Sequence, residues 1–129
     1  MRTDRVAVDY HRDDERRRIV ATSIGQVSVA DTLGVIDRQA SDGAWSYGFL
    51  WDLRGSEDIP TAADLRRIVL HVADLTMKYG PRGPVAFVVL DAVLSRVTRQ
   101  YGRMAKLTAF NVRVFTTMEE AERWLEKDA

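Results

Sequence analysis

The start of the chain alternates between apolar and polar residues. Val6, Val8 and Tyr10 are separated by polar residues, and the segment 17–25 becomes apolar again after the polar turn 11–16. A period of two residues is typical of a strand with one covered face, and two such runs joined by a polar turn predict a hairpin. We expect this opening pair of strands to be antiparallel.

The rest of the chain changes between two other patterns. The segments 45–53 and 84–91 are short and almost entirely apolar, which is typical of strands covered on both faces, and 110–114 alternates as a last strand. Apolar residues recur at helical spacing in four segments: 28–43, 65–79, 94–104 and 118–125. This order predicts an α/β fold in which an N-terminal hairpin leads into a mainly parallel five-stranded sheet with four helices.

Composition limits the class of protein. A chain of 129 residues, 46% hydrophobic and 29% charged, can bury one core but is short for two ordinary domains, so a single domain over 1–129 is expected. Nineteen basic residues balance nineteen acidic ones, so no overall positive field favours a nucleic acid. We expect no nucleic-acid partner.

The chain has no cysteine, which excludes disulfides, thiolate catalysis and cysteine-ligated zinc. The polar opening segment has no apolar run like that of a secretory signal, and no later segment approaches the length of a membrane span. These features favour a cytoplasmic protein without a membrane span.

The predicted last strand and helix carry a distinctive pattern. Val112, Val114 and Phe115 form a Val-x-Val-Phe sequence, and Trp124 and Leu125 stand together in the following helix. In this tail, and in the order of its elements, the chain resembles the STAS-like family, relatives of the sporulation anti-sigma-factor antagonists. The likeness covers nearly the whole chain as architecture. It implies a single STAS-like domain of a bacterial regulatory protein.

The resemblance extends to one loop. In the antagonists the third strand runs into Asp-Leu-Ser-Gly, and a short link leads to an apolar residue and Asp-Ser-Ser-Gly at a helix start. Here Asp52, Leu53 and Gly55 match the first part, Ile59 matches the apolar residue, and Thr61 falls on the serine that the family phosphorylates. Thr61 is therefore the phosphoacceptor candidate.

The same loop departs from the family's pattern. Pro60 replaces the aspartate before the phosphoacceptor, while Ala62 and Ala63 replace the second serine and the glycine. The resemblance implies a loop that binds a protein partner, such as an anti-sigma-factor-like kinase. The candidate partner or ligand residues are Asp52, Arg54, Ser56, Asp58 and, at the end of the next strand, Asp91.

Thr61 also has a structural interpretation. A threonine followed three residues later by Asp64 is typical of a helix N-cap, which contributes about 1 kcal/mol. The same spacing recurs at Ser28 with Asp31 and at Thr117. A cap alone explains the threonine, and a phosphoacceptor remains the alternative.

Two other groups of charged residues have both a functional and a structural interpretation. Asp52 and Asp91 end the two central strands, where α/β proteins bind ligands, but a metal would need more oxygen ligands and Asp91 is also placed to cap a helix. A basic stripe follows one helix, and it is either a solvated face or a site for an anion or an acidic partner. Its members are Arg96, Arg99, Arg103 and Lys106.

Sequence motifs of enzymes are missing from the chain. Neither a nucleophile elbow nor a phosphate loop nor a zinc-protease motif is present, and the two histidines are isolated. Four aromatic residues crowd 45–51, and we expect their side chains to be divided between the two faces of the sheet. Core packing is their expected use, although an apolar ligand pocket could draw on them.

Three hypotheses follow. The first is a non-enzymatic regulatory module that binds a protein partner and is switched by phosphorylation at Thr61. The second is a carrier or sensor of a small apolar, lipid-like ligand, since the STAS-like fold resembles lipid-carrying domains in shape. The third, with least support, is an enzyme that uses the carboxylates at the strand ends. No cofactor is expected.

Overall fold

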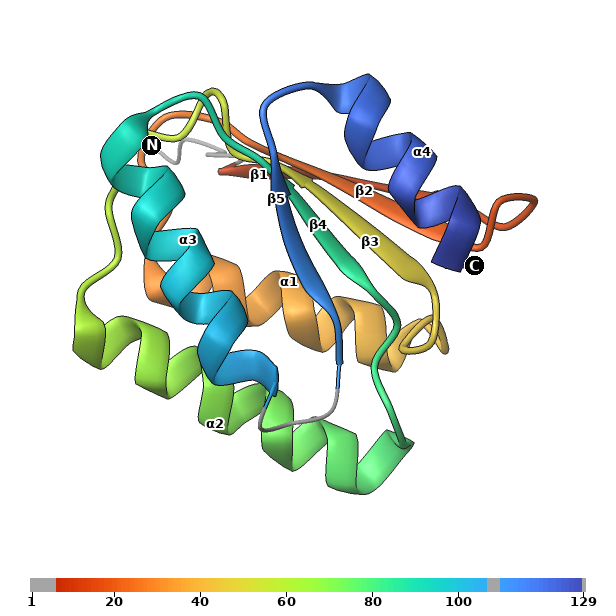
Figure 1. Cartoon of the computed structure of the whole chain (residues 1–129). Coiled ribbons are helices and arrows are strands. Elements are labelled where there is room, and N and C mark those ends of the chain that lie inside the picture. Colours follow the sequence, from red (N-terminus) through yellow and green to blue (C-terminus); the bar gives the residue numbers. More distant parts are fainter. Residues whose placement is uncertain (1–6, 107–109, 129) are drawn as a thin grey trace, which may run out of the picture.

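The structure is a computed structural model that describes residues 7–106 and 110–128 (Figure 1). Its elements follow one another as β1 (Val8–Asp13), β2 (Arg18–Ser23), α1 (Val29–Ser41), β3 (Gly48–Asp52), α2 (Ala62–Tyr79), β4 (Val85–Val88), α3 (Ala92–Ala105), β5 (Val112–Phe115) and α4 (Met118–Asp128). The strands form one sheet in the order β1-β2-β3-β4-β5. The hairpin pair is antiparallel and the other pairs are parallel. The predicted α/β fold is confirmed. Val6, which was predicted to belong to the first strand, lies outside the described residues.

The predicted strand boundaries differ from the observed ones by a few residues. β1 continues through His11 to Asp13, so the hairpin turn is shorter than 11–16. β3 begins only at Gly48, and Trp45 and Tyr47 belong to the turn before it. An apolar run therefore marks the position of a strand better than its ends, since buried turn residues are apolar as well.

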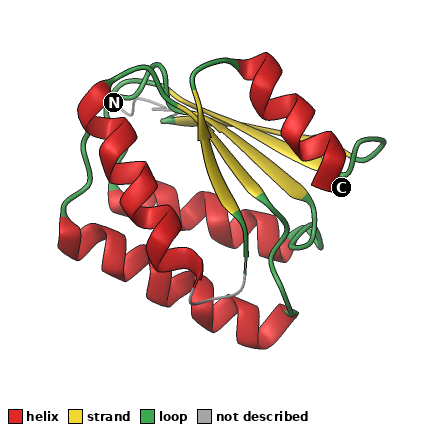
Figure 2. Ribbon diagram, viewed as in Figure 1, coloured by secondary structure: helices red, strands yellow, loops and turns green. Residues whose placement is uncertain are grey.

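The sheet has a different cover on each face. Figure 2 shows α1, α2 and α3 on one side and α4 alone on the other. Phe49 and Trp51 both face the three helices and lie with their ring centroids 5.2 Å apart, whereas Leu50 belongs to the cluster under α4. The expectation that these aromatic side chains would divide between the faces was wrong, because residues two apart in a strand share a face.

The helix starts confirm the predicted caps. The Thr61 hydroxyl accepts the N–H of Asp64 at 3.1 Å, and the Asp64 carboxylate accepts the Thr61 N–H at 3.0 Å. The same reciprocal box joins Ser28 and Asp31. The Thr117 hydroxyl likewise accepts the N–H of Glu120 at 3.2 Å. These side chains bond the free N–H groups that every helix start leaves.

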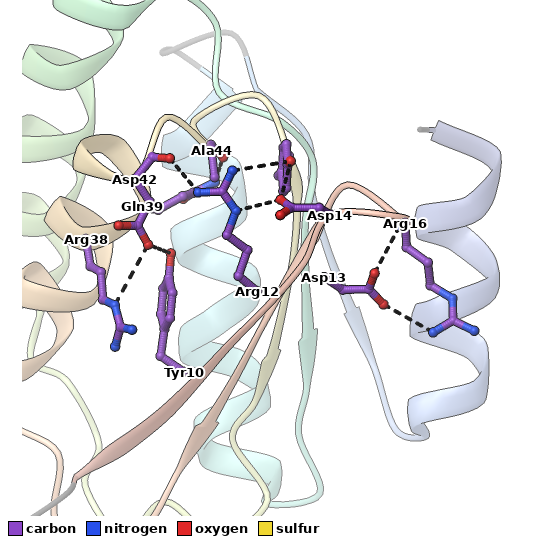
Figure 3. A network of polar contacts seen from close by, with 10 residues as sticks. Tyr10, Arg12, Asp13, Asp14, Arg16, Arg38, Gln39, Asp42 and Ala44 are labelled. Carbon is purple, nitrogen blue, oxygen red and sulfur yellow. Dashed lines mark hydrogen bonds and ion pairs between the residues drawn. The ribbon is translucent and has the colours of Figure 1, made fainter.

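Polar contacts hold the hairpin to α1 at the amino edge of the sheet, the edge where β2 to β5 begin. The Tyr10 hydroxyl donates to Asp42 at 3.2 Å, and Arg12 donates to Asp14 at 2.6 Å and to the Asp42 carbonyl at 2.5 Å (Figure 3). The Tyr47 hydroxyl donates to Asp14 at 2.6 Å. Burial and the Asp42 carboxylate raise the pKa of Tyr10 to about 12, so its hydroxyl stays a donor.

Candidate partner-binding edge

The carboxyl edge, where β2, β3 and β4 end, is built from loops that support one another. The Gly25 N–H donates to the Gly55 carbonyl at 2.9 Å, and the Glu57 N–H donates to the Gly25 carbonyl at 2.8 Å. A side chain at Gly55 would lie 2.9 Å from the Ser23 carbonyl, so only glycine allows this close approach. The loops after β2 and β3 are thus fixed side by side.

The Asp52 carboxylate forms an ion pair with Arg54 of the same loop. The Arg54 guanidinium donates to both oxygens of the Asp52 carboxylate at 2.9 Å, and the Arg54 N–H adds a third bond at 3.0 Å. The Asp52 side chain is 10% exposed, while that of Arg54 is 43% exposed. The hydrogen bonds from Arg54 lower the pKa of Asp52, and the same pairing raises the pKa of Arg54. Asp52 therefore orders the start of the loop as an ionised carboxylate.

Three further candidate residues lie at this edge. Asp91, after β4, caps α3 by accepting the Leu94 N–H at 2.9 Å. Ser56 forms a β-bridge with Gly25, and Asp58 lines a cavity behind the loop. Among residues 7–106 and 110–128, no three acidic or histidine side chains are grouped to hold a metal ion.

Large apolar side chains are exposed at the same edge. Of these, the sequence had indicated only Ile59 as part of the loop. Ile24 follows β2, and Ile59 lies in the loop before α2. Leu90 lies between β4 and α3, and Val93 lies in the first turn of α3. Their exposed fractions are 54% for Ile24, 43% for Ile59, 66% for Leu90 and 51% for Val93. Three neighbouring loops thus present large apolar groups to solvent.

The basic stripe of α3 is exposed, and most of it faces one groove. Arg99, Arg103 and Lys106 line a groove between α3 and β5, where Arg113 of β5 joins them. Arg96 is exposed but does not line this groove. The lining of this groove includes no residue of the loop 52–61, so the groove and the candidate loop are separate surfaces.

Comparison with known proteins identifies the fold. The chain is similar to an uncharacterized protein of the DUF3478 family with a SpoIIAA-like fold from Shewanella loihica PV-4, with a TM-score of 0.60 and 15% sequence identity over 97% of this chain and 98% of the other. No family model and no curated protein matches the chain. The chain thus has a SpoIIAA-like fold, the fold of the STAS-like modules. None of the helices that the structure describes is long and apolar enough to span a membrane.

Proposed function

We propose that the carboxyl edge is a protein-binding surface and that the chain acts as a non-enzymatic regulatory module. The observation that carries this proposal is the group of exposed apolar side chains at Ile24, Ile59, Leu90 and Val93. Single exposed apolar residues are ordinary, but a group on neighbouring loops marks an interaction surface. The Asp52 carboxylate and the backbone groups that join Gly25 to Gly55 are already bonded within the chain, so burying them against a partner leaves them paired.

The fold supports the same location. In the antagonists that the loop 52–61 resembles, a kinase that also acts as an anti-sigma factor recognises this loop, and phosphorylation ends the contact. The proposed partner is a protein of that class, with an apolar surface that complements Leu90 and Ile59. Thr61 is exposed at the start of α2, so a kinase can reach it and a phosphate there would lie at a favourable helix N-terminus.

The surface is tested by matched charge insertions. A partner captured with the wild-type chain is purified, and its affinity is measured for the wild type, Leu90→Asp and Met77→Asp. Met77 is 88% exposed near the end of α2, so it controls for the added charge. We expect Leu90→Asp to weaken binding by roughly tenfold or more, as for a central interface residue, and Met77→Asp to leave it unchanged. Equal effects of the two variants would place the interface elsewhere.

The switch is tested at Thr61 with a pair of substitutions that both keep a helix cap. Aspartate and asparagine cap helices about equally well, so Thr61→Asp and Thr61→Asn differ mainly in charge. We expect Thr61→Asp to change the affinity for the partner and Thr61→Asn to leave it near that of the wild type. If both variants bind like the wild type, Thr61 is only a cap and the regulatory switch is rejected.

A further inference from the structure

A cavity of about 80 Å³ lies between the sheet and the three helices α1, α2 and α3. Trp51, Val85 and Phe87 line it from the sheet, and Ile68, Leu94 and Tyr101 line it from the helices. Most of the wall is thus apolar. Two charged residues are among the lining groups, Asp58 in the loop after β3 and Arg82 just before β4. Because the strands are parallel, these two charges belong to opposite ends of the cavity.

The chain around Arg82 is held against the turn before β3. The Gly83 N–H donates to the Trp45 carbonyl at 3.0 Å, and the Trp45 indole N–H donates to the Gly80 carbonyl at 2.9 Å. A side chain at position 83 would collide with the Tyr47 carbonyl. These contacts fix the segment 80–84 and direct the side chain of Arg82 into the interior.

Arg82 is only 5% exposed, and its guanidinium donates to the Gln39 side chain and also lies within hydrogen-bonding reach of the Tyr101 phenol. Two guanidinium N–H groups donate to the Gln39 side-chain oxygen at 3.1 and 2.9 Å. Gln39 is fully buried and is itself held by donating to the Ala44 carbonyl at 3.0 Å. The guanidinium also lies 5.1 to 5.4 Å from the ring centroids of Trp45, Phe49 and Phe110. None of these four neighbouring side chains carries a negative charge.

The charge of Arg82 is not neutralised within the part of the chain that the structure describes. The ion pairs among the described residues all join other side chains, and none of them involves Arg82. Burial lowers the pKa of Arg82 but leaves a guanidinium charged, and burial raises the pKa of Tyr101, so that phenol stays neutral. Amide and ring contacts compensate a buried cation only in part. A carboxylate is the group that fits a guanidinium best.

We infer that this cavity binds a small carboxylic acid with a short apolar chain, with its carboxylate at Arg82 and its chain against Phe87 and Leu94. Asp58 at the other end repels an anion, which fixes this orientation. The size of the cavity limits the chain, since an engineered cavity of about 150 Å³ accommodates benzene and this one is about half as large. The site goes beyond the proposed partner surface, although Ser56, Asp58 and Pro60 of the same loop line it.

The charge requirement is tested with two probes of similar shape. The wild-type chain is titrated with sodium acetate and with acetamide, and NMR follows the methyl groups of Val85 and Leu94 and the Nε–H of Arg82. We expect saturable shifts at these groups with acetate, and an affinity for acetamide that is roughly 10- to 100-fold weaker, as for the loss of a charged hydrogen bond. Equal affinity for the two probes, or no saturable shift with acetate, would overturn the inference.

Variants locate the site. Arg82→Met should lose acetate binding, while Arg99→Met, which removes an exposed charge from α3, should keep it. Retained binding in Arg82→Met would refute the assignment. If Arg82→Met fails to fold, Val97→Phe fills the cavity without altering Arg82 and must weaken acetate binding, and unchanged binding there would also refute the assignment. No readout involves a partner protein, so a negative result leaves the carboxyl-edge proposal standing.

Discussion

The two edges of the parallel sheet are built on opposite principles. At the amino edge, Tyr10, Arg12 and Tyr47 bond carboxylates or carbonyls of neighbouring elements, so the hairpin, α1 and the turn before β3 hold one another. At the carboxyl edge, Asp52 and Arg54 pair within one loop, and large apolar side chains such as Leu90 are left exposed. Both edges are made of loops between strands and helices. The amino edge is therefore a structural edge, and the carboxyl edge is the one that we propose to bind a partner.

This difference predicts where substitutions affect stability and where they affect function. Residues of the amino edge and of the buried contacts behind it should stabilise the fold. The apolar residues of the carboxyl edge should contribute little, because they are not buried.

The largest loss of stability is expected from Gln39→Leu. This change removes the oxygen that accepts two N–H groups of the buried Arg82 and leaves the Ala44 carbonyl without its side-chain donor. An uncompensated buried cation costs about 3 kcal/mol or more, which urea denaturation measures as a fall in the free energy of unfolding. Gln100→Leu is the control, since Gln100 is exposed on α3. A similar small effect of both changes would show that Arg82 does not depend on Gln39.

A smaller loss is expected from Asp52→Asn. The ion pair with Arg54 is partly exposed, so its removal should cost about 1.5 kcal/mol at neutral pH. Because folding lowers the pKa of Asp52, this contribution is complete above about pH 4 and disappears as the pH falls through the native pKa. The stabilities of wild type and variant should therefore converge on acidification. A constant difference from neutral to acid pH would exclude the ion pair as the cause.

Thr61→Ala should cost about 1 kcal/mol, because it removes the side-chain cap of α2. Thr61→Ser keeps the hydroxyl and should unfold close to the wild type. The measurement is the free energy of unfolding of both variants. If Thr61→Ser is as unstable as Thr61→Ala, the methyl group and not the cap carries the effect.

The smallest effect on stability is expected at the carboxyl edge itself. Leu90→Asp should change the free energy of unfolding by no more than about 0.5 kcal/mol, since Leu90 is 66% exposed. Thermal denaturation of the isolated chain measures this change. A large loss of stability would mean that Leu90 packs against the fold, and any loss of partner binding could not then be assigned to the surface.

Periodicity predicts the elements of this fold but not their ends. The alternation of β1, the apolar runs of β3 and β4 and the helical spacing of α2 each indicate the correct element. The caps at Ser28 and Thr61 are visible in the sequence because each depends on two residues three positions apart. Strand ends depend on pairing with distant segments, as at Gly48, which pairs with Arg18 of β2, and a local pattern does not contain that information.

The candidate sites could be predicted only in part. The loop 52–61 was located by its resemblance to a known family, but the pairing of Asp52 with Arg54 depends on side-chain geometry. Arg82 gave no signal beyond its place between glycines and prolines in the turn-forming segment 80–84, because its burial depends on contacts with Gln39 and Trp45 in another part of the chain. Leu90 ends an apolar run and gives no sign that it points to solvent.

Site-specific photo-crosslinking tests the central claim most directly. A benzophenone side chain is placed at Leu90 in one variant and at Met77 in another, and both are irradiated in the native host and analysed by mass spectrometry. The carboxyl-edge interface predicts one protein crosslinked at position 90, lost when Ile59→Asp is added, and absent at position 77. The same adducts at both positions, or none at position 90, would contradict it.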